Sequence, residues 1–242
     1  MRILSYNIHK GIGGRDRRYD LQRVIDVIDA QEPDVICLQE VDRNVRRSGY
    51  DDQPAILAEH FRAQGVAFQL NHRVGQGGYG NLVLSRWPLS WHSDVSLKLK
   101  WRKSRAAIVA VVQSPDGPVK VVNQHLGLAE TERRWQIREL LESEPLLRED
   151  NLPTAIVGDF NDWRDTLHRL ELQAAGFLQA TAPPRSFRSF PAFMPAGALD
   201  KAFVRGLEVA VAHVIRDGLA RVASDHLPLV VDLSSARTPG SR

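Results

Sequence analysis

Apolar, strand-like runs that end in acids, amides or a histidine recur in this chain, and this pattern constrains its fold most strongly. Four such runs end at Asn7, at Glu40, at His125 and at Asp159-Phe160-Asn161, and a fifth polar cluster, Ser224-Asp225-His226, precedes the last apolar run. Acids and amides are costly to bury unless they are paired or bind a metal. One polar strand end is explained by a capped loop, whereas five indicate that the strand ends converge on one site.

Short runs rich in β-branched residues recur along the whole chain, with amphipathic helix patterns between some of them. The predicted strands are Ile3–Ile8, Val35–Gln39, Ala67–Asn71, Asn81–Ser85, Ala106–Val112, Val119–Asn123, Thr154–Gly158, Ala202–Val204 and Leu229–Leu233. The predicted helices are Asp20–Ala30, Gln53–Gln64 and Thr131–Leu147. The segment Ser114-Pro115-Asp116-Gly117-Pro118 is typical of a hairpin turn. These elements predict an α/β fold in which two mixed or antiparallel sheets pack face to face, with helices outside.

The length and the lack of a linker bear on domain organisation and location. A chain of 242 residues makes one large domain or two small ones. Because no linker or repeat divides it, we expect a single domain over residues 1–233 and a flexible tail over residues 234–242. One cysteine, Cys37, excludes an intramolecular disulfide and a multi-cysteine zinc site. No run approaches a membrane span and no secretory signal is evident, so we expect a monomeric, soluble cytoplasmic protein.

The polar strand ends carry oxygen ligands and histidines. Oxygen ligands without a cysteine set favour Mg²⁺ or Mn²⁺ over structural zinc. Mg²⁺ binds through one or two carboxylates and keeps waters and substrate phosphate oxygens, a demand that Glu40 and Asp225 fit. Two histidines, His125 and His226, lie near acids, as general acid–base chemistry or stabilisation of a phosphoryl oxyanion requires.

Seven segments in order resemble the endonuclease/exonuclease/phosphatase superfamily, in particular a small bacterial branch of it. They are Ser5-Tyr6-Asn7-Ile8, Leu38-Gln39-Glu40-Val41, Gly80-Asn81-Leu82-Val83-Leu84-Ser85-Arg86, Asn123-Gln124-His125-Leu126, Gly158-Asp159-Phe160-Asn161, Leu199-Asp200-Lys201-Ala202-Phe203-Val204 and Ser224-Asp225-His226-Leu227-Pro228. The resemblance runs from about residue 1 to 233. It implies a four-layer α/β/β/α sandwich, with two mixed β-sheets face to face and helices outside. It also implies metal-dependent hydrolysis of a phosphoester by an activated water.

The resemblance assigns a metal set and a nucleophile set. Glu40 matches the principal ligand of Mg²⁺ or Mn²⁺, Asn7 lies beside that metal, and Asp225 matches a second ligand. Asp159 matches the residue that orients or deprotonates the attacking water, and Asn161 the amide that holds the phosphate and the nucleophile.

The resemblance further assigns the groups that meet the phosphate. His226 matches the histidine on the scissile phosphate, Asp200 the acid that pairs with it, and His125 a second catalytic histidine. Arg105 matches a phosphate-binding arginine. An acid behind His226 favours its cationic form, but no comparable acid is evident for His125, which leaves its protonation state open.

Two further polar residues, His9 and Asn81, follow or lie within the matching segments. We expect His9 at the surface, and Asn81 either caps a turn or touches the substrate.

Basic residues bear on the substrate. The chain has 26 arginines and 6 lysines, a net charge of +3 and an isoelectric point near 9.2. They cluster as Lys10, Arg15, Arg17 and Arg18; as Arg43, Arg46 and Arg47; and as Arg102, Lys103 and Arg105. Arginine binds phosphate through two parallel hydrogen bonds, so these clusters favour a nuclease or phosphodiesterase acting on DNA.

Two other functions remain open. Short loops, and aromatic and basic residues alternating through residues 183–195, fit a phosphoesterase for phospholipid headgroups, inositol phosphates or other small phosphorylated metabolites. A non-catalytic binding module is a remote alternative, because the set of acids and histidines is complete.

Overall fold

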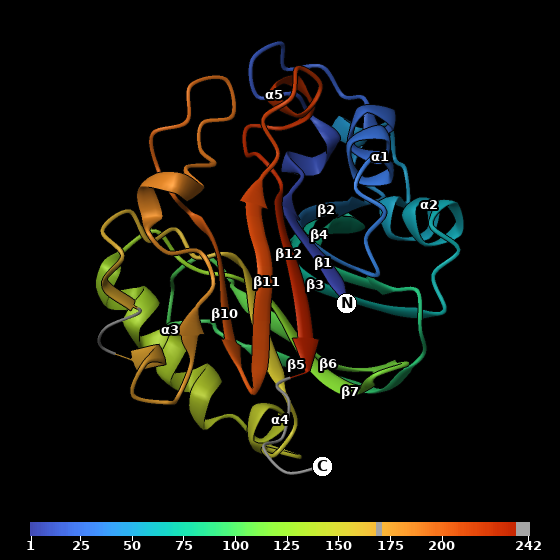
Figure 1. The fold of residues 1–242 in the computed structure, drawn as a ribbon. Coiled ribbons are helices and arrows are strands. Elements are labelled where there is room, and N and C mark those ends of the chain that lie inside the picture. Colours follow the sequence, from blue (N-terminus) through green and yellow to red (C-terminus); the bar gives the residue numbers. More distant parts are fainter. Residues whose placement is uncertain (168–170, 236–242) are drawn as a thin grey trace.

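Two six-stranded sheets form the centre of the protein (Figure 1). The structure is a computed structural model that describes residues 1–167 and 171–235. The first sheet has the order β11-β12-β1-β2-β4-β3, with β1 Arg2–Asn7, β2 Val35–Arg43, β3 Gly65–Val74, β4 Gly77–Ser85, β11 Leu207–Val214 and β12 Leu229–Ser235. The second has the order β5-β6-β7-β8-β10-β9, with β5 Leu89–Ser96, β6 Ala106–Ser114, β7 Gly117–His125, β8 Thr154–Asp159, β9 Leu178–Gln179 and β10 Asp200–Arg205.

Both sheets are mixed, and one parallel pair in each brings polar strand ends together. β1 runs parallel to β2, so Asn7 lies beside Gln39, next to Glu40. β7 runs parallel to β8, so His125 pairs with Asp159. β10 runs antiparallel to β8 and sets Asp200 opposite Asp159. The predicted convergence of the strand ends is thus present in both sheets.

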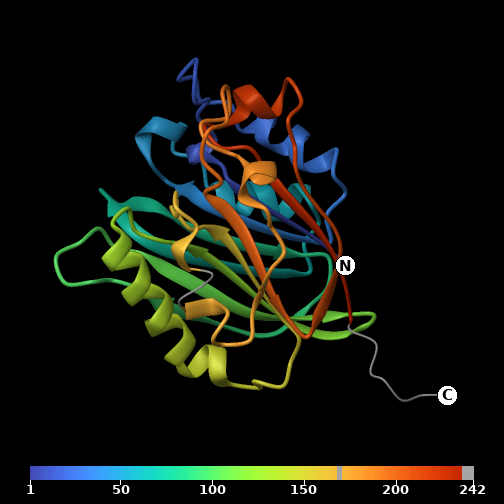
Figure 2. The ribbon, with the colours of Figure 1, turned by 60° about the vertical axis from the view of Figure 1, so that its left-hand side comes forward.

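Helices cover the outer faces of the sheets (Figure 2). α1 (Leu21–Asp29) and α2 (Gln53–His60) lie on the first sheet, while α3 (Glu130–Glu142) and α4 (Glu144–Leu147) lie on the second. The predicted helix over Thr131–Leu147 is divided at Ser143, where a proline follows in the first turn of α4. The short α5 (Ala220–Ala223) lies near α1, next to the loop that follows β1. The predicted sandwich of two sheets between helices is confirmed.

Apolar residues of β6 show how the layers are held together. Ile108, Ala110 and Val112 belong to the core between the sheets, whereas Ala107 and Val109 belong to the core beneath α3. Successive side chains of a strand point to opposite faces, so a strand covered on both sides is apolar throughout.

Edge strands account for the strands that the sequence pattern did not reveal. β5, β9 and β11 were not predicted, and each lies at the edge of its sheet. β9 has only two residues, and most side chains of β5 and β11 are partly or fully exposed. A one-sided edge strand needs fewer apolar residues. The predicted hairpin turn is confirmed, with Ser114 paired to Gly117. β12 extends through Ser235, two residues beyond the predicted strand, and residues 236–242 of the predicted tail lie outside the described residues.

Buried amides bridge the two sheets behind the polar strand ends. Gln39 donates its side-chain amide to Asn123 Oδ1 at 2.7 Å, and Asn123 Nδ2 donates to the carbonyl of Leu38 at 2.8 Å. Asn81 is fully buried and donates to the carbonyl of Ala106 at 2.9 Å. Asn81 therefore connects the sheets. None of the described helices is long and apolar enough to cross a membrane.

Candidate active site

A cavity of about 260 Å³ lies where the polar strand ends meet. It is lined by Asn7, His9, Lys10, Glu40, Lys103, Arg105, His125, Leu128, Asp159, Asn161, Asp225 and His226. Every residue predicted for the site lines this cavity except Asp200, which lies behind His226. Residues from six separate segments thus surround one space, which we call the active-site cavity.

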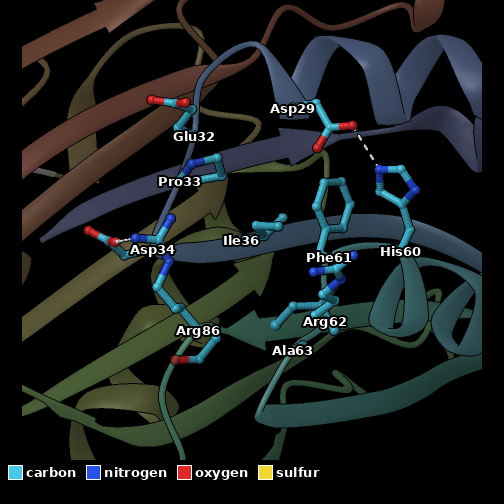
Figure 3. A pocket seen from close by; sticks show the side chains of 12 residues that line it. Asp29, Glu32, Pro33, Asp34, Ile36, His60, Phe61, Arg62, Ala63 and Arg86 are labelled. Carbon is cyan, nitrogen blue, oxygen red and sulfur yellow. Dashed lines mark hydrogen bonds and ion pairs between the residues drawn. The ribbon is translucent and has the colours of Figure 1, made fainter.

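A larger cavity, of about 530 Å³, lies at the other end of β2 (Figure 3). It is lined by Asp34 and Ile36 from the start of that strand. Its charged groups are largely satisfied by one another, because His60 pairs with Asp29 at 2.7 Å and Arg86 with Asp34 at 3.1 Å (Figure 3). It does not contain the predicted acid and histidine set, so size alone does not identify the site.

His226 is held by two acids. Its Nδ1 lies 2.8 Å from Oδ2 of Asp200, and Ser189 Oγ donates to the same oxygen at 2.5 Å. Burial alone would lower the pKa of His226, but the carboxylates of Asp200 and Asp159 outweigh it and raise that pKa to about 10. The ring of Phe190 lies 4.8 Å from the imidazole. His226 is therefore a fixed cation at neutral pH.

Asp159 is the central acid of the cavity. Its Oδ2 accepts a hydrogen bond from Asn7 Nδ2 at 3.1 Å, and its Oδ1 accepts one from the backbone N–H of Asn161 at 2.9 Å. Nε2 of His125 and Nε2 of His226 lie 3.4 and 3.7 Å from Oδ2. Burial raises the pKa of Asp159 to about 6, against the opposing effect of His226. A carboxylate with such a pKa is ionised at neutral pH and is suited to accept a proton.

His125 differs from His226 in its charge. It is buried, and burial together with the nearby Arg105 guanidinium holds its pKa well below the usual range. This lowered pKa favours the neutral imidazole at pH 7 for His125, whose protonation state the sequence left open. Among the described residues, the acid nearest to its ring in an ion-pair geometry is Asp159.

Glu40 occupies a strained position in β2. The register of β2 with β4 shifts between Leu38 and Val41, and Glu40 has a φ of 58° within this irregularity. Bulges of this kind redirect a side chain next to a functional site. Burial would raise the pKa of Glu40, but the ammonium of Lys10, which pairs with its carboxylate, keeps that pKa well below its usual range.

Among the described residues, four of the twelve with a positive φ, glycines apart, line the cavity. His9, Lys10 and Asn161 also have positive φ values, of 45°, 66° and 50°. Left-handed conformations of residues other than glycine cost about 1–3 kcal/mol each and persist where the surrounding structure enforces them. They cluster at sites of chemistry more often than elsewhere.

The predicted metal set fits a sparsely coordinated ion. Within residues 1–167 and 171–235 there is no group of three or more His, Cys, Asp or Glu side chains placed to hold a metal. Mg²⁺ does not need such a group, because it takes one or two carboxylates and otherwise waters and phosphate. Glu40 and Asp225, both on the cavity wall, supply two. Asn7 is engaged at both ends of its amide, by Asp159 and by the backbone N–H of His9, and so chiefly positions Asp159.

Two features of the site differ from the sequence expectations. His9 lies in the cavity rather than at the surface, with Nδ1 2.8 Å from the carbonyl of Ile12 and Nε2 3.9 Å from Asp225 Oδ2. Its position directly after the polar end of β1 is the signal that indicates this location. Arg47, grouped with the phosphate-attracting clusters, is instead bound through two hydrogen bonds, of 2.9 and 2.6 Å, to the buried Asp42.

The two sheets between helices bring a histidine cation, a buried acid and a buried arginine to one cavity. The chain belongs to the Endonuclease/Exonuclease/phosphatase family, whose sequence model matches residues 4–226. Members of this family are hydrolases that act on phosphoester bonds.

The similar proteins match nearly the whole length of this chain. An uncharacterized protein of Escherichia coli, YbhP, is 29% identical over 96% of this chain and 95% of its own. The crystal structure of an endonuclease/exonuclease/phosphatase from Beutenbergia cavernae superposes with a TM-score of 0.78 and 24% identity over 97% of this chain and 71% of its own. The mannosyl-6-phosphatase Bt3783 of Bacteroides thetaiotaomicron superposes with a TM-score of 0.74 and 17% identity over 97% of this chain and 99% of its own.

Proposed function

We propose that this protein is a Mg²⁺- or Mn²⁺-dependent phosphodiesterase that uses an activated water and acts on DNA. The observation that carries the proposal is a pair of neighbouring groups on the cavity wall whose pKa values are shifted differently. They are cationic His226, backed by Asp200, and the buried carboxylate of Asp159, 3.7 Å from Nε2 of His226. Phosphoester hydrolysis needs both, an acceptor for the proton of water and a cation for the charge that develops on the phosphoryl oxygens.

Asp159 and Asn161 act on the water. Asn7 and the N–H of Asn161 fix the carboxylate of Asp159, which takes the proton as the water attacks phosphorus. The Nδ2 of Asn161 donates to the carbonyl of Leu126 at 3.0 Å, which fixes the amide and leaves its oxygen and its second N–H to orient the water. The leaving alkoxide is displaced as the new P–O bond forms.

Cations stabilise the phosphoryl group. His226 and Arg105 line the cavity as donors that gain strength as negative charge grows on the phosphoryl oxygens. Neutral His125 offers a hydrogen bond without adding charge. A divalent metal held by Glu40 and Asp225 supplies, when bound, Lewis-acid stabilisation of the same oxygens.

The preference for DNA is supported by the basic surface near the cavity. Arg15, Arg17 and Arg18 are exposed in the loop after β1, and Gly14 of this loop packs against Asp225. A polymer crossing the cavity would meet these side chains, and such contacts dominate nucleic-acid affinity.

A small phosphorylated metabolite is the second candidate. One observation favours it: Arg47 is bound to the carboxylate of Asp42, so this side chain offers less free charge than the sequence indicates. The similar fold of a mannosyl-6-phosphatase is compatible with such a substrate.

A metal-supplemented activity panel tests both candidates. It compares plasmid DNA, abasic duplex, RNA, a generic phosphodiester, phospholipids, inositol phosphates and sugar phosphates, with the wild type and His226→Ala. His213→Ala, an exposed histidine of β11, is the matched control. We expect DNA to be cleaved fastest and only His226→Ala to lose activity. Retained turnover of His226→Ala on every substrate would refute the mechanism, and faster turnover of a small phosphoester would refute the assignment to DNA.

A further inference from the structure

A second cavity opens beside the active-site cavity and shares part of its wall. It has a volume of about 420 Å³ and lies between Arg102, Lys103 and Arg105 on one side and residues 127–129 with Glu132 on the other. Lys103, Arg105 and Leu128 line both cavities. We call this space the adjoining cavity, since any group bound there lies next to the active-site cavity.

The cations of the adjoining cavity have no anionic partners. Among residues 1–167 and 171–235, no carboxylate forms an ion pair with Arg102, Lys103 or Arg105, whereas Arg47 and Lys10 nearby each have one. The acid that lines this cavity, Glu132, packs against Gly127 and accepts a hydrogen bond from Gln136 at 3.5 Å. Three positive charges therefore face one negative charge.

Arg105 is the clearest sign that an anion is missing. It is 6% exposed, and its Nε is buried without a hydrogen-bond partner among the described residues. A buried guanidinium is unfavourable unless an anion meets it. The planar guanidinium of Arg105 has N–H donors on two sides, so it can bind one phosphate in each of the two cavities that it separates.

Tyr79 fixes the position of Lys103. The charged groups of Lys10, Arg47 and Lys103 lie 5.4, 5.0 and 5.3 Å from the centre of its largely buried ring. Glu40 and Asp42 neutralise the first two, and Lys103 alone of the three remains available. Cation–π attraction holds its ammonium beside the shared wall without consuming its charge.

We propose that the adjoining cavity is a second anion subsite, which binds a phosphate of the substrate next to the phosphate that is hydrolysed. The proposal rests on the proposed function, because it places the scissile phosphate in the active-site cavity, beside His226 and Asp159. Arg105, in the shared wall, contacts both phosphates, and Lys103 and Arg102 contact the second one. Leu128, 74% exposed, gives an apolar surface to the group that joins them. The preferred substrate is thus a phosphodiester with a further phosphate beside the scissile bond.

Matched substrates with and without the further phosphate test the subsite. The first set is thymidylyl-thymidine bare, 5′-phosphorylated or 3′-phosphorylated, and the second pair is glycerophosphoinositol and its 4-phosphate. We measure KM with Mg²⁺ and, independently of turnover, the dissociation constant with Ca²⁺. Lys103→Ala is compared with Lys98→Ala, which removes the same charge from the same loop but lines neither cavity.

In the wild type we expect one phosphorylated member to bind about tenfold more tightly than its unphosphorylated counterpart. Lys103→Ala should abolish this preference, because it weakens binding of the phosphorylated member far more than binding of the bare diester, and Lys98→Ala should preserve it. The set that shows the preference identifies a nucleotide or a lipid headgroup as the source of the phosphate. Equal binding of phosphorylated and bare members by the wild type, or equal effects of the two variants, would overturn the subsite even if hydrolysis is observed. Preference in binding without hydrolysis would support the subsite and refute the proposed function.

Discussion

Nδ1 of His226 lies 2.8 Å from Oδ2 of Asp200, and both side chains are buried. Because Asp159 approaches the other ring nitrogen at 3.7 Å, the imidazole lies between two carboxylates. The two carboxylates together keep His226 positively charged where it lines the active-site cavity. The order of β8 and β10 in the second sheet produces it, since Asp159 and Asp200 are paired across the two strands.

Asp200→Asn should lower the pKa of His226 from about 10, because one of the two stabilising carboxylates loses its charge. An NMR titration of His226 in the metal-free protein measures this directly. We also expect about tenfold lower turnover and a basic limb of the pH–rate profile at lower pH. Asp116→Asn, in the exposed β6–β7 turn, is the control that should change neither. An unchanged titration would show that Asp200 does not control the charge of His226.

Asp159→Asn should abolish turnover and yet stabilise the fold at pH 7. The pKa of Asp159 is raised from 3.8 to about 6, so the wild type loses stability as pH rises through this interval, while its carboxyl ionises in a buried site. The asparagine variant escapes this loss, which amounts to about 1–3 kcal/mol. Urea unfolding at pH 3.5 and pH 7 measures it: the variant's advantage should be present at pH 7 and absent at pH 3.5. If the variant and the wild type were equally stable at pH 7 as well as at pH 3.5, the raised pKa of Asp159 would be contradicted.

The fold and most of the site could be predicted because both depend on local patterns. Apolar runs ending in Asn7, Glu40, His125 and Asp159 indicate buried strands with chemistry at one edge, and the structure places these ends around one cavity. Asp200 also fits, since it begins β10 directly opposite the end of β8.

The remaining features depend on contacts between distant segments. Nothing in the residues around Arg47 reveals that Asp42 folds back to neutralise it, and nothing around Lys10 reveals its pairing with Glu40. The charge of His125 likewise depends on burial and on Arg105, which precedes the β6 residue that pairs with His125. Edge strands β5 and β11 were not predicted because one covered face leaves no strong apolar pattern, and β9 was not predicted because it has only two residues.

Removal of the metal or of its main ligand should stop the reaction without unfolding the protein. We expect excess EDTA to abolish turnover and Mg²⁺ or Mn²⁺ to restore it. Glu40→Gln should reduce turnover by about 100-fold or more, because a neutral amide binds a divalent ion weakly. Circular dichroism before and after treatment checks the fold. Full activity in EDTA, or a tightly bound zinc whose removal unfolds the chain, would rule out this cofactor assignment.

Lys10→Met should tighten metal binding at Glu40. In the structure the Lys10 ammonium forms an ion pair with the Glu40 carboxylate that a metal would need. Lys10 and a metal ion would therefore compete for this carboxylate and repel each other at close range. Methionine keeps the apolar length of the side chain and removes the charge. Calorimetric titration with Mn²⁺ should give a dissociation constant about tenfold lower than that of the wild type.

A second measurement separates this competition from a merely structural ion pair. Without metal, Lys10→Met leaves a buried carboxylate unpaired and should lower the unfolding temperature, whereas saturating Mn²⁺ should restore most of the loss because the metal replaces the missing cation. Lys98→Met, on an exposed loop remote in sequence from Glu40, should change neither property. If Lys10→Met binds Mn²⁺ as the wild type does or more weakly, Lys10 supports the metal site rather than competing for it, and Glu40 would have to bind the ion through the oxygen that Lys10 does not contact.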